Sequence, residues 1–196
     1  FCRRADQSAY EGQWAENFQH GDGLEVWADG SRYQGQYSRG LKSGRGRFSW
    51  SRGASYDGEF ANNEIHGAGT YVWPDGRRFE GQWAWSQMDG LGHYTWPDGS
   101  SYRGEYRNDR KDGNGVFRFP DGRIYEGQWR RGEQHGSGLL EDPSGERRPG
   151  EWQQGKRVRW LSTIPEVSTP PLPTPERWPS TSTPPPPPRR SSFVDE

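Results

Sequence analysis

The chain alternates aromatic and polar residues in a pattern that returns every 23 positions. One copy, residues 79–101, reads FEGQWAWSQMDGLGHYTWPDGSS. Six full copies follow one another without insertion, and a partial seventh begins at Arg148. The full copies begin at Tyr10, Tyr33, Tyr56, Phe79, Tyr102 and Tyr125. A fixed period of this length indicates a tandem-repeat protein.

Within each copy the aromatic residues fall at every second position, which is the period of a β-strand and not of a helix. Positions 1, 3 and 5, counted from the first aromatic, hold an aromatic, a glycine and an aromatic, as in Tyr33, Gly35 and Tyr37. Positions 16 and 18 are again aromatic, as in Tyr94 and Trp96. Because side chains alternate between the two faces of a strand, each copy predicts two strands that share one aromatic face.

Two kinds of turn connect these strands. Pro97-Asp98-Gly99 and its equivalents lie between copies: Pro presets the first turn angle, Asp bonds back to the backbone, and Gly takes the left-handed site. Inside each copy the pattern predicts a six-residue loop at positions 6 to 11. Position 8 holds mostly Gly, Asn or Asp, which predicts a positive φ there. Each copy is therefore a predicted β-hairpin.

All 28 glycines fall at positions 3, 8, 12, 14 or 21 of the repeat. Glycines beneath the aromatic face should let the sheet curl and the rings lie against bare backbone. A single hairpin is marginally stable in water, so neighbouring copies must pair to bury a continuous aromatic stripe. The expected fold class is all-β: a single-layer, elongated, twisted antiparallel sheet of tandem hairpins.

The order Tyr-x-Gly-x-Trp/Tyr, loop, Gly-x-Gly, aromatic strand and Pro-Asp-Gly turn resembles the MORN repeat (membrane occupation and recognition nexus), over about residues 10–155. The resemblance implies a non-catalytic cytoplasmic scaffold at membranes, the cytoskeleton or cilia. It also implies three modes of association: phospholipid binding, a partner helix or extended peptide in the groove, and homodimers. MORN arrays also stand beside catalytic domains, as in plant-type phosphatidylinositol phosphate kinases. A regulatory fragment of a larger enzyme is therefore the alternative, and the first residue, Phe1, fits a fragment.

Composition supports a thin sheet. Hydrophobic residues make up 28% of the chain, and half of that share is aromatic, so a two-layer core is excluded while one buried aromatic face is possible. Residues 1–9 are predicted to be a disordered N-terminal segment, 10–160 the repeat domain, and 161–196 a disordered tail rich in proline. The single Cys2 excludes an internal disulfide, and no apolar run is long enough to span a bilayer.

The net charge of −1 gives no field for nucleic acid, so no nucleic-acid partner is expected. Residues 10–101 carry 12 acidic and 8 basic side chains, whereas residues 102–160 carry 10 acidic and 13 basic ones. The outward positions of the array are mainly acidic and would repel an anionic membrane surface. The candidate lipid contacts are therefore the cations of the basic end: Arg103, Arg107, Arg110, Lys111, Arg130 and Arg131.

A protein partner is expected to lay apolar groups against the rings of the central copies, because a large exposed apolar patch marks an interface. The candidate groove residues are Tyr56, Trp73, Phe79, Trp83, Trp96 and Tyr102. In the tail, Pro185-x-x-Pro188-x-Arg190 fits an SH3-type ligand, and five successive prolines suit a profilin-like groove.

No pattern of residues indicates catalysis. His20, His66 and His135 recur at position 11 but in different hairpins, which favours turn residues over metal ligands. Acidic side chains at positions 2 and 4 lie on an open face, without a pocket to shift their pKa values. The Gly-x-Gly of each copy precedes a strand, so it lacks the helix dipole that holds phosphate. We therefore expect no catalytic residue, no metal and no cofactor.

Overall fold

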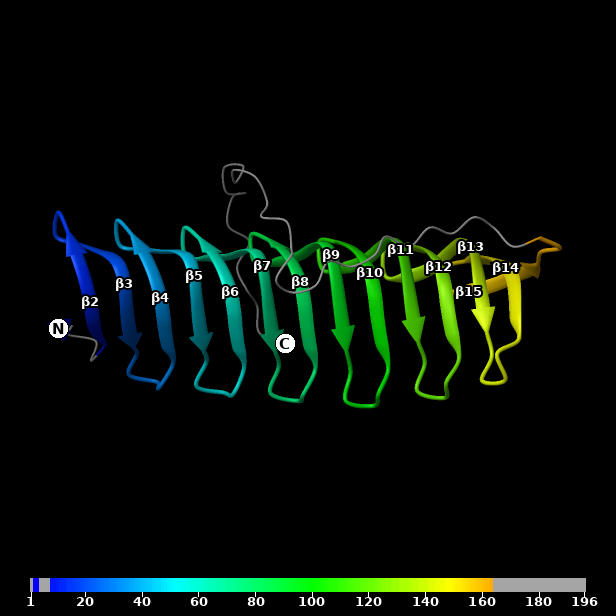
Figure 1. The fold of residues 1–196 in the computed structure, drawn as a ribbon, viewed down its shortest axis with the longest axis horizontal. Coiled ribbons are helices and arrows are strands. Elements are labelled where there is room, and N and C mark those ends of the chain that lie inside the picture. The colour runs from blue at the N-terminus through cyan, green and yellow to red at the C-terminus, as the bar shows by residue number, and fades with distance from the viewer. Residues whose placement is uncertain (1, 4–7, 164–196) are drawn as a thin grey trace.

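The computed structural model describes residues 2–3 and 8–163, which form one sheet of 15 strands. Each strand pairs antiparallel with the strand before it and the strand after it, so the sheet is an unbroken meander in chain order (Figure 1). The strands are β1 (Cys2–Arg3), β2 (Ala9–Ala15), β3 (Phe18–Val26), β4 (Arg32–Ser38), β5 (Leu41–Ser49), β6 (Ser55–Ala61), β7 (Glu64–Val72), β8 (Arg78–Ala84), β9 (Gln87–Thr95), β10 (Ser101–Arg107), β11 (Arg110–Arg118), β12 (Ile124–Arg130), β13 (Glu133–Glu141), β14 (Arg147–Gln153) and β15 (Lys156–Trp160). The predicted single-layer, all-β fold is confirmed.

The strands extend beyond the predicted repeat domain at the N-terminus only, because β15 ends at Trp160, the last residue of the predicted 10–160 range. β14 and β15 pair with each other, so the partial seventh copy is a complete hairpin. Near the N-terminus Cys2 pairs with Tyr10 and Arg3 with Ala9, so these residues belong to the sheet although the sequence suggested no regular structure there. Residues 1, 4–7 and 164–196 lie outside the described residues. The tail motif of Pro185, Pro188 and Arg190 is among them.

The turn inside each copy is shorter than the predicted six-residue loop. It has two residues, at positions 7 and 8, and both have positive φ, as in Asn62 (51°) and Asn63 (73°). This is the type I′ geometry that matches the twist of the flanking strands. The prediction of positive φ at position 8 is confirmed. The prediction missed position 7, where Trp85 also has φ of 51°.

A β-bulge accounts for the residues that the sequence assigned to the loop. In the fourth copy Gly81 faces Gly92 and Trp83 faces Met88, so two steps on β8 oppose four on β9. The same register shift recurs in every copy from β2 to β13. Positions 9 to 11 therefore belong to the second strand, with glycine at positive φ at position 12, where Gly90 has φ of 102°.

A ladder of paired glycines crosses the sheet and carries the buried rings. Gly12 faces Gly23, Gly23 faces Gly35, and the pairing continues through the copies to Gly150. A Cβ on Gly23 would lie 2.5 Å from the ring of Tyr10, so the position-1 ring rests on bare backbone as predicted. The Tyr10 hydroxyl donates to the carbonyl oxygen of Gln13 at 2.9 Å, which satisfies its only donor inside the core.

The core of the sheet is a row of edge-to-face aromatic rings from positions 1 and 5, which we call the buried ring row. Its rings contact one another within a copy, as in Phe79–Trp83 at 5.0 Å between centroids, and between successive copies, as in Phe79–Tyr106 at 5.2 Å. Its members are Tyr10, Tyr33, Tyr37, Tyr56, Phe60, Phe79, Trp83, Tyr102, Tyr106, Tyr125, Trp129 and Trp152, all at most 7% exposed. T-shaped packing of this kind favours aromatic pairs beyond the area they bury.

Candidate functional site

A second line of rings, from positions 16 and 18, runs beside the buried ring row, and we call it the aromatic strip. Its members are Trp27, Phe48, Trp50, Tyr71, Trp73, Tyr94, Trp96, Phe117 and Phe119. Successive centroids lie 4.3–5.7 Å apart from the first ring to the last. All of these rings except Tyr94 are only half-buried. The strip is therefore a continuous aromatic surface that stays accessible along five copies.

The turns between copies hold the strip in place. The strip residue at position 18 closes each turn with its backbone, as in the fourth copy: Trp96 N–H donates to the Ser100 carbonyl oxygen and the Trp96 carbonyl accepts from Gly99 N–H, at 3.0 and 3.1 Å. Asp98 accepts from the Ser100 backbone N–H at 2.9 Å, as the turn chemistry predicted. The ring at position 18 is therefore fixed at the end of its strand, next to the turn between copies.

The strip ends where the repeat sequence changes. In the sixth copy position 18 is Asp142, which accepts the backbone N–H groups of Ser144 and Glu146 at 2.8 and 3.0 Å and so forms the turn itself. In the first copy position 16 is Glu25, a buried carboxylate that accepts the hydroxyl hydrogen of Tyr37 at 2.9 Å. Burial, followed by the charge of Glu25, raises the pKa of Tyr37.

The structure divides the six predicted groove residues between the two lines of rings. Tyr56, Phe79 and Tyr102 are 0% exposed and Trp83 is 4% exposed, so these four lie in the buried ring row and present almost no surface to a partner. Trp73 and Trp96 lie in the aromatic strip and stay accessible. Of the six predicted groove residues, a partner can therefore reach only the two in the strip, and the alternation of the sequence did not separate the two lines of rings.

Position 10 of the repeat also contributes to the core, which the sequence analysis missed because it placed this position in a loop. Ile65 is 8% exposed, and Met88 packs against the same cluster. At the equivalent site Lys111 points its ammonium over four rings, with Nζ 4.5 Å from the Trp129 centroid and 4.6 Å from that of Phe117. Burial lowers the pKa of Lys111 to about 8.

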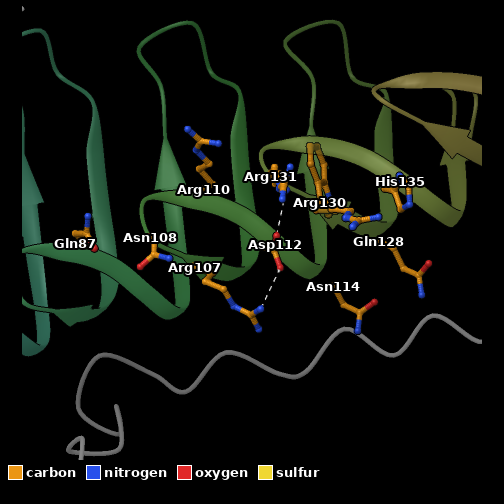
Figure 2. Close-up of a pocket in the computed structure, with 12 residues that line it drawn as sticks. Gln87, Arg107, Asn108, Arg110, Asp112, Asn114, Gln128, Arg130, Arg131 and His135 are labelled. Atoms are coloured by element: carbon orange, nitrogen blue, oxygen red, sulfur yellow. Dashed lines mark hydrogen bonds and ion pairs between the residues drawn. The ribbon is translucent and has the colours of Figure 1, made fainter. Parts of the chain in front are cut away.

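The basic end contains an open hollow of about 880 Å³ between the inner turns of the fifth and sixth copies (Figure 2). Arg107, Arg110, Arg130 and Arg131 line it, together with the amide side chains of Asn108, Asn114 and Gln128. Its one acidic lining residue, Asp112, lies 3.9 Å from Arg107 Nη1 and accepts the backbone N–H of Arg131 at 3.1 Å. Cations therefore outnumber carboxylates in the hollow.

Four of the six predicted lipid contacts thus converge on the hollow, and two do not. Lys111 is half-buried over the rings, and Arg103 is exposed on the strand β10 away from the hollow's lining. The hollow lies beside the turns inside the copies, at one end of the strands. The aromatic strip lies beside the turns between copies, at the other end of the strands. The two predicted sites are therefore separate surfaces.

The glutamine or glutamate at position 4 has a structural role in the bulge. Gln82 Oε1 accepts the backbone N–H of Leu91 at 2.8 Å, and Glu105 Oε1 accepts that of Asn114 at 2.9 Å. Without this acceptor the bulge would leave a backbone donor unpaired. The sequence showed the recurrence of these residues but not the bulge that requires them.

The described residues hold no group of three His, Cys, Asp or Glu side chains placed to bind a metal ion. His66 packs against Trp85 at 5.1 Å between centroids, and burial lowers its pKa. His135 lines the hollow, and His20 is exposed. In the part of the chain that the structure describes, no helix is long and apolar enough to cross a membrane.

The model of one protein family, described as MORN repeat, matches the chain six times, at residues 10–32, 33–55, 56–77, 79–101, 102–122 and 125–147. These segments coincide with the six full copies of the repeat. A family of such repeats, with a sheet of this kind, fits a non-catalytic binding scaffold. No curated protein matches the chain as a relative.

Solved structures of TCP domains share a broad likeness to the sheet. The TCP domain of Drosophila melanogaster SAS-4, in complex with a proline-rich motif of Ana2, is 14% identical, with a TM-score of 0.41, over 83% of this chain and 95% of that one. The TCP10 domain of Danio rerio CPAP is 14% identical, with a TM-score of 0.32, over 82% of each chain. At these scores the likeness does not transfer function between chains.

Proposed function

The chain belongs to the MORN-repeat family, and on that premise we propose that it is a scaffold that binds a protein partner along the aromatic strip. The observation that carries the proposal is the unbroken line of half-buried rings on one side of the sheet. Aromatic side chains are enriched in protein interfaces, and a few of them near the centre usually supply most of the binding energy.

The shape of the strip restricts the partner to an elongated one. Trp27 and Phe119 occupy the same position four copies apart, and with two strands per copy at ~4.8 Å spacing the strip is about 38 Å long. A helix or an extended peptide can contact rings along this length, whereas a globular surface meets only a few of them. The central rings Trp73 and Trp96 are the expected anchors.

The test is an affinity capture with the full chain as bait, comparing the wild type with Trp96→Ala. We expect the specific partner to be lost from the variant, since truncating a central aromatic anchor costs about 2 kcal/mol or more. Phe18→Ala is the matched control, because Phe18 is a 52% exposed aromatic residue outside the strip. Circular dichroism establishes that both variants remain folded.

Retention of the same proteins by wild type and Trp96→Ala would contradict binding at the strip. Loss of the partner from both Trp96→Ala and Phe18→Ala would show that the effect is not specific to the strip. This result would equally contradict binding at the strip.

A second candidate function is contact with an anionic membrane surface, and the basic hollow favours it. Vesicles that contain phosphatidylserine and a phosphoinositide should then bind the full chain, less so after Arg107→Ala/Arg110→Ala. Binding should fall steeply with salt, because exposed charges are screened beyond about 8 Å at physiological ionic strength. Arg45→Ala/Arg52→Ala, in the acidic half, is the matched control. Equal binding by all three proteins would exclude the hollow as the membrane-binding site.

We also propose a cytoplasmic location with attachment to a membrane, the cytoskeleton or a cilium, on the basis of family membership alone. Imaging of a fluorescent fusion tests it, and a luminal or secreted signal would contradict it.

A further inference from the structure

We propose that the chain's own proline-rich segment, residues 170–188, covers the aromatic strip as a polyproline II helix. The inference rests on the strip being the binding surface proposed above, and it adds a way in which that surface is regulated. Polyproline II segments bind in grooves lined by aromatic rings, because the helix is preformed and loses little entropy on docking. The strip offers a continuous line of such rings, and the same chain carries 16 prolines, 11 of them after residue 161.

The spacing of the strip matches the period of this helix. One copy adds two strands to the sheet, so equivalent rings such as Trp73 and Trp96 lie about 9.6 Å apart along it. A polyproline II helix rises ~3.1 Å per residue with three residues per turn, or about 9.3 Å per turn. Every third residue of the helix therefore meets an equivalent ring in the next copy, and the mismatch over four copies stays near ~1 Å.

The tail has prolines at this period. Pro170, Pro173, Pro179, Pro185 and Pro188 are separated by multiples of three, so they fall on one face of a polyproline II helix. That face has seven positions between residues 170 and 188, and proline occupies all but residues 176 and 182. The other prolines of the tail fall on the two remaining faces of the helix. The prolines of one face can therefore be replaced without changing those of another.

The connection from the sheet is long enough. β15 ends at Trp160 and runs in the same direction as β11. Both strands therefore point toward the turns between copies, where the strip lies. Four strand spacings, about 19 Å, separate β15 from β11, which precedes Phe119. Residues 161–169 can span up to about 30 Å when extended, and residues 170–188 as polyproline II cover about 56 Å, more than the length of the strip. The tail can therefore run back along the strip from Phe119 to Trp27.

A tail docked in this way competes with any partner for the same rings. The tether gives the segment an effective concentration in the millimolar range, so even a weak intrinsic affinity would keep the strip mostly covered. A partner must then displace the tail, or an event in the tail must release it.

The experiment measures binding of a synthetic peptide of residues 168–190 to three full-length proteins by fluorescence anisotropy. The first is the wild type. The second, the in-phase variant, has Pro170, Pro173, Pro179, Pro185 and Pro188 changed to Ala. The third, the out-of-phase variant, has the same number of changes at Pro171, Pro175, Pro184, Pro186 and Pro187. Both variants keep the length and charge of the tail, so they differ only in the face that loses proline.

We expect the peptide to bind the in-phase variant at least about tenfold more tightly than the other two proteins, whose own tails occupy the strip. Adding Trp96→Ala to the in-phase variant should abolish peptide binding, and adding Phe18→Ala should not. Equal affinities for all three proteins, or no binding to the in-phase variant, would overturn the proposal. Concentration-dependent dimers that the in-phase changes dissolve would overturn it too, because the occupant would then be the tail of a second copy.

The same variants separate this inference from the proposed function. If affinity capture loses a partner on Trp96→Ala but retains it equally with wild type and the in-phase variant, the strip binds a partner and the tail does not cover it. Increased capture by the in-phase variant alone supports both.

Discussion

At the scale of single residues, one hydroxyl group is missing from an otherwise regular set. The position-1 tyrosines donate to the carbonyl oxygen of position 4, at 2.9–3.1 Å. The fourth copy has Phe79 at this position, so the carbonyl oxygen of Gln82 has no such donor. The ring itself is as fully buried as the tyrosines.

We predict that Phe79→Tyr raises the free energy of unfolding by about 0.5–1.5 kcal/mol, the net contribution of a satisfied hydrogen bond. The converse change, Tyr125→Phe, should lower it by a similar amount, because the Tyr125 hydroxyl donates to Gln128 at 3.1 Å. Urea denaturation of the two variants measures both effects. Destabilisation by Phe79→Tyr would mean that the site has no room for the oxygen.

Lys111 gives a prediction about pH. Its pKa is about 8 in the folded chain and about 10.4 when unfolded. The unfolded chain therefore binds more protons between these values, and this group makes stability increase as pH rises from 8 toward 10. The variant Lys111→Met carries the residue that the fourth copy has at the same position, Met88. It should be more stable than the wild type at pH 7 by about 1–3 kcal/mol.

That advantage should shrink as the pH approaches 10, where the folded lysine is already neutral. Denaturation midpoints of both proteins at pH 7, 8 and 9.5 test this, and the tyrosines, common to both, cancel in the difference. A constant difference across the range would show that attraction to the rings offsets the burial of the charge.

At the scale of elements, the hairpin depends on two neighbouring positions: a glycine where a side chain has no space and a glutamine whose side chain is needed. A Cβ at Gly81 would lie 2.6 Å from both Gly92 Cα and the Leu91 carbonyl oxygen, so the neighbouring strand would have to shift. The bulge one step further along depends on Gln82, which pairs its extra donor. Packing and polar pairing therefore fix the same point of each hairpin.

Gly81→Val should lower the free energy of unfolding by about 1–3 kcal/mol, as overpacking does. Because each copy contacts only its neighbours, hydrogen exchange should rise around residues 79–101 and stay unchanged near Tyr10. Ala84→Val, also on β8 but next to the turn, is the control and should have little effect. Uniform loss of protection across the sheet would contradict a repeat-by-repeat assembly.

At the scale of the whole molecule, the six full copies have the same length and the same pairing to their neighbours, and the described strands follow chain order from end to end. Stability is then approximately a sum of repeat and interface terms. The array should accept the loss of a whole repeat but not of half of one, because antiparallel pairing needs strands of alternating direction.

We predict that deletion of residues 79–101 leaves a folded sheet whose urea m-value falls by about one seventh, in proportion to the surface exposed on unfolding. Deletion of residues 78–86, which removes β8 and the turn after it, should instead abolish the cooperative transition. Circular dichroism and urea denaturation distinguish the two results. A cooperative transition in both would contradict the meander.

The sequence alone determined the period, the strands, the shared aromatic face and the turns between copies. These features follow from local chemistry: side chains alternate along a strand, Pro-Asp-Gly favours one turn, and glycine accepts rings on its backbone. It also located the basic end, because charge is countable. The existence and order of the six full hairpins were therefore predictable, with the positive φ at position 8, although the turn inside each copy was predicted too long.

Only the tertiary structure decided which rings a partner can reach. Phe79 and Trp96 look equivalent in the pattern, yet one is buried beneath rings of the next copy and the other stays half-exposed at the edge. The sequence also did not predict the bulge or the inward direction of the Lys111 side chain. Both depend on the register between strands, which is set by pairing between strands and not by the order of residues in one strand. Exposure and register are properties of contact between copies, which the sequence of a single copy does not contain.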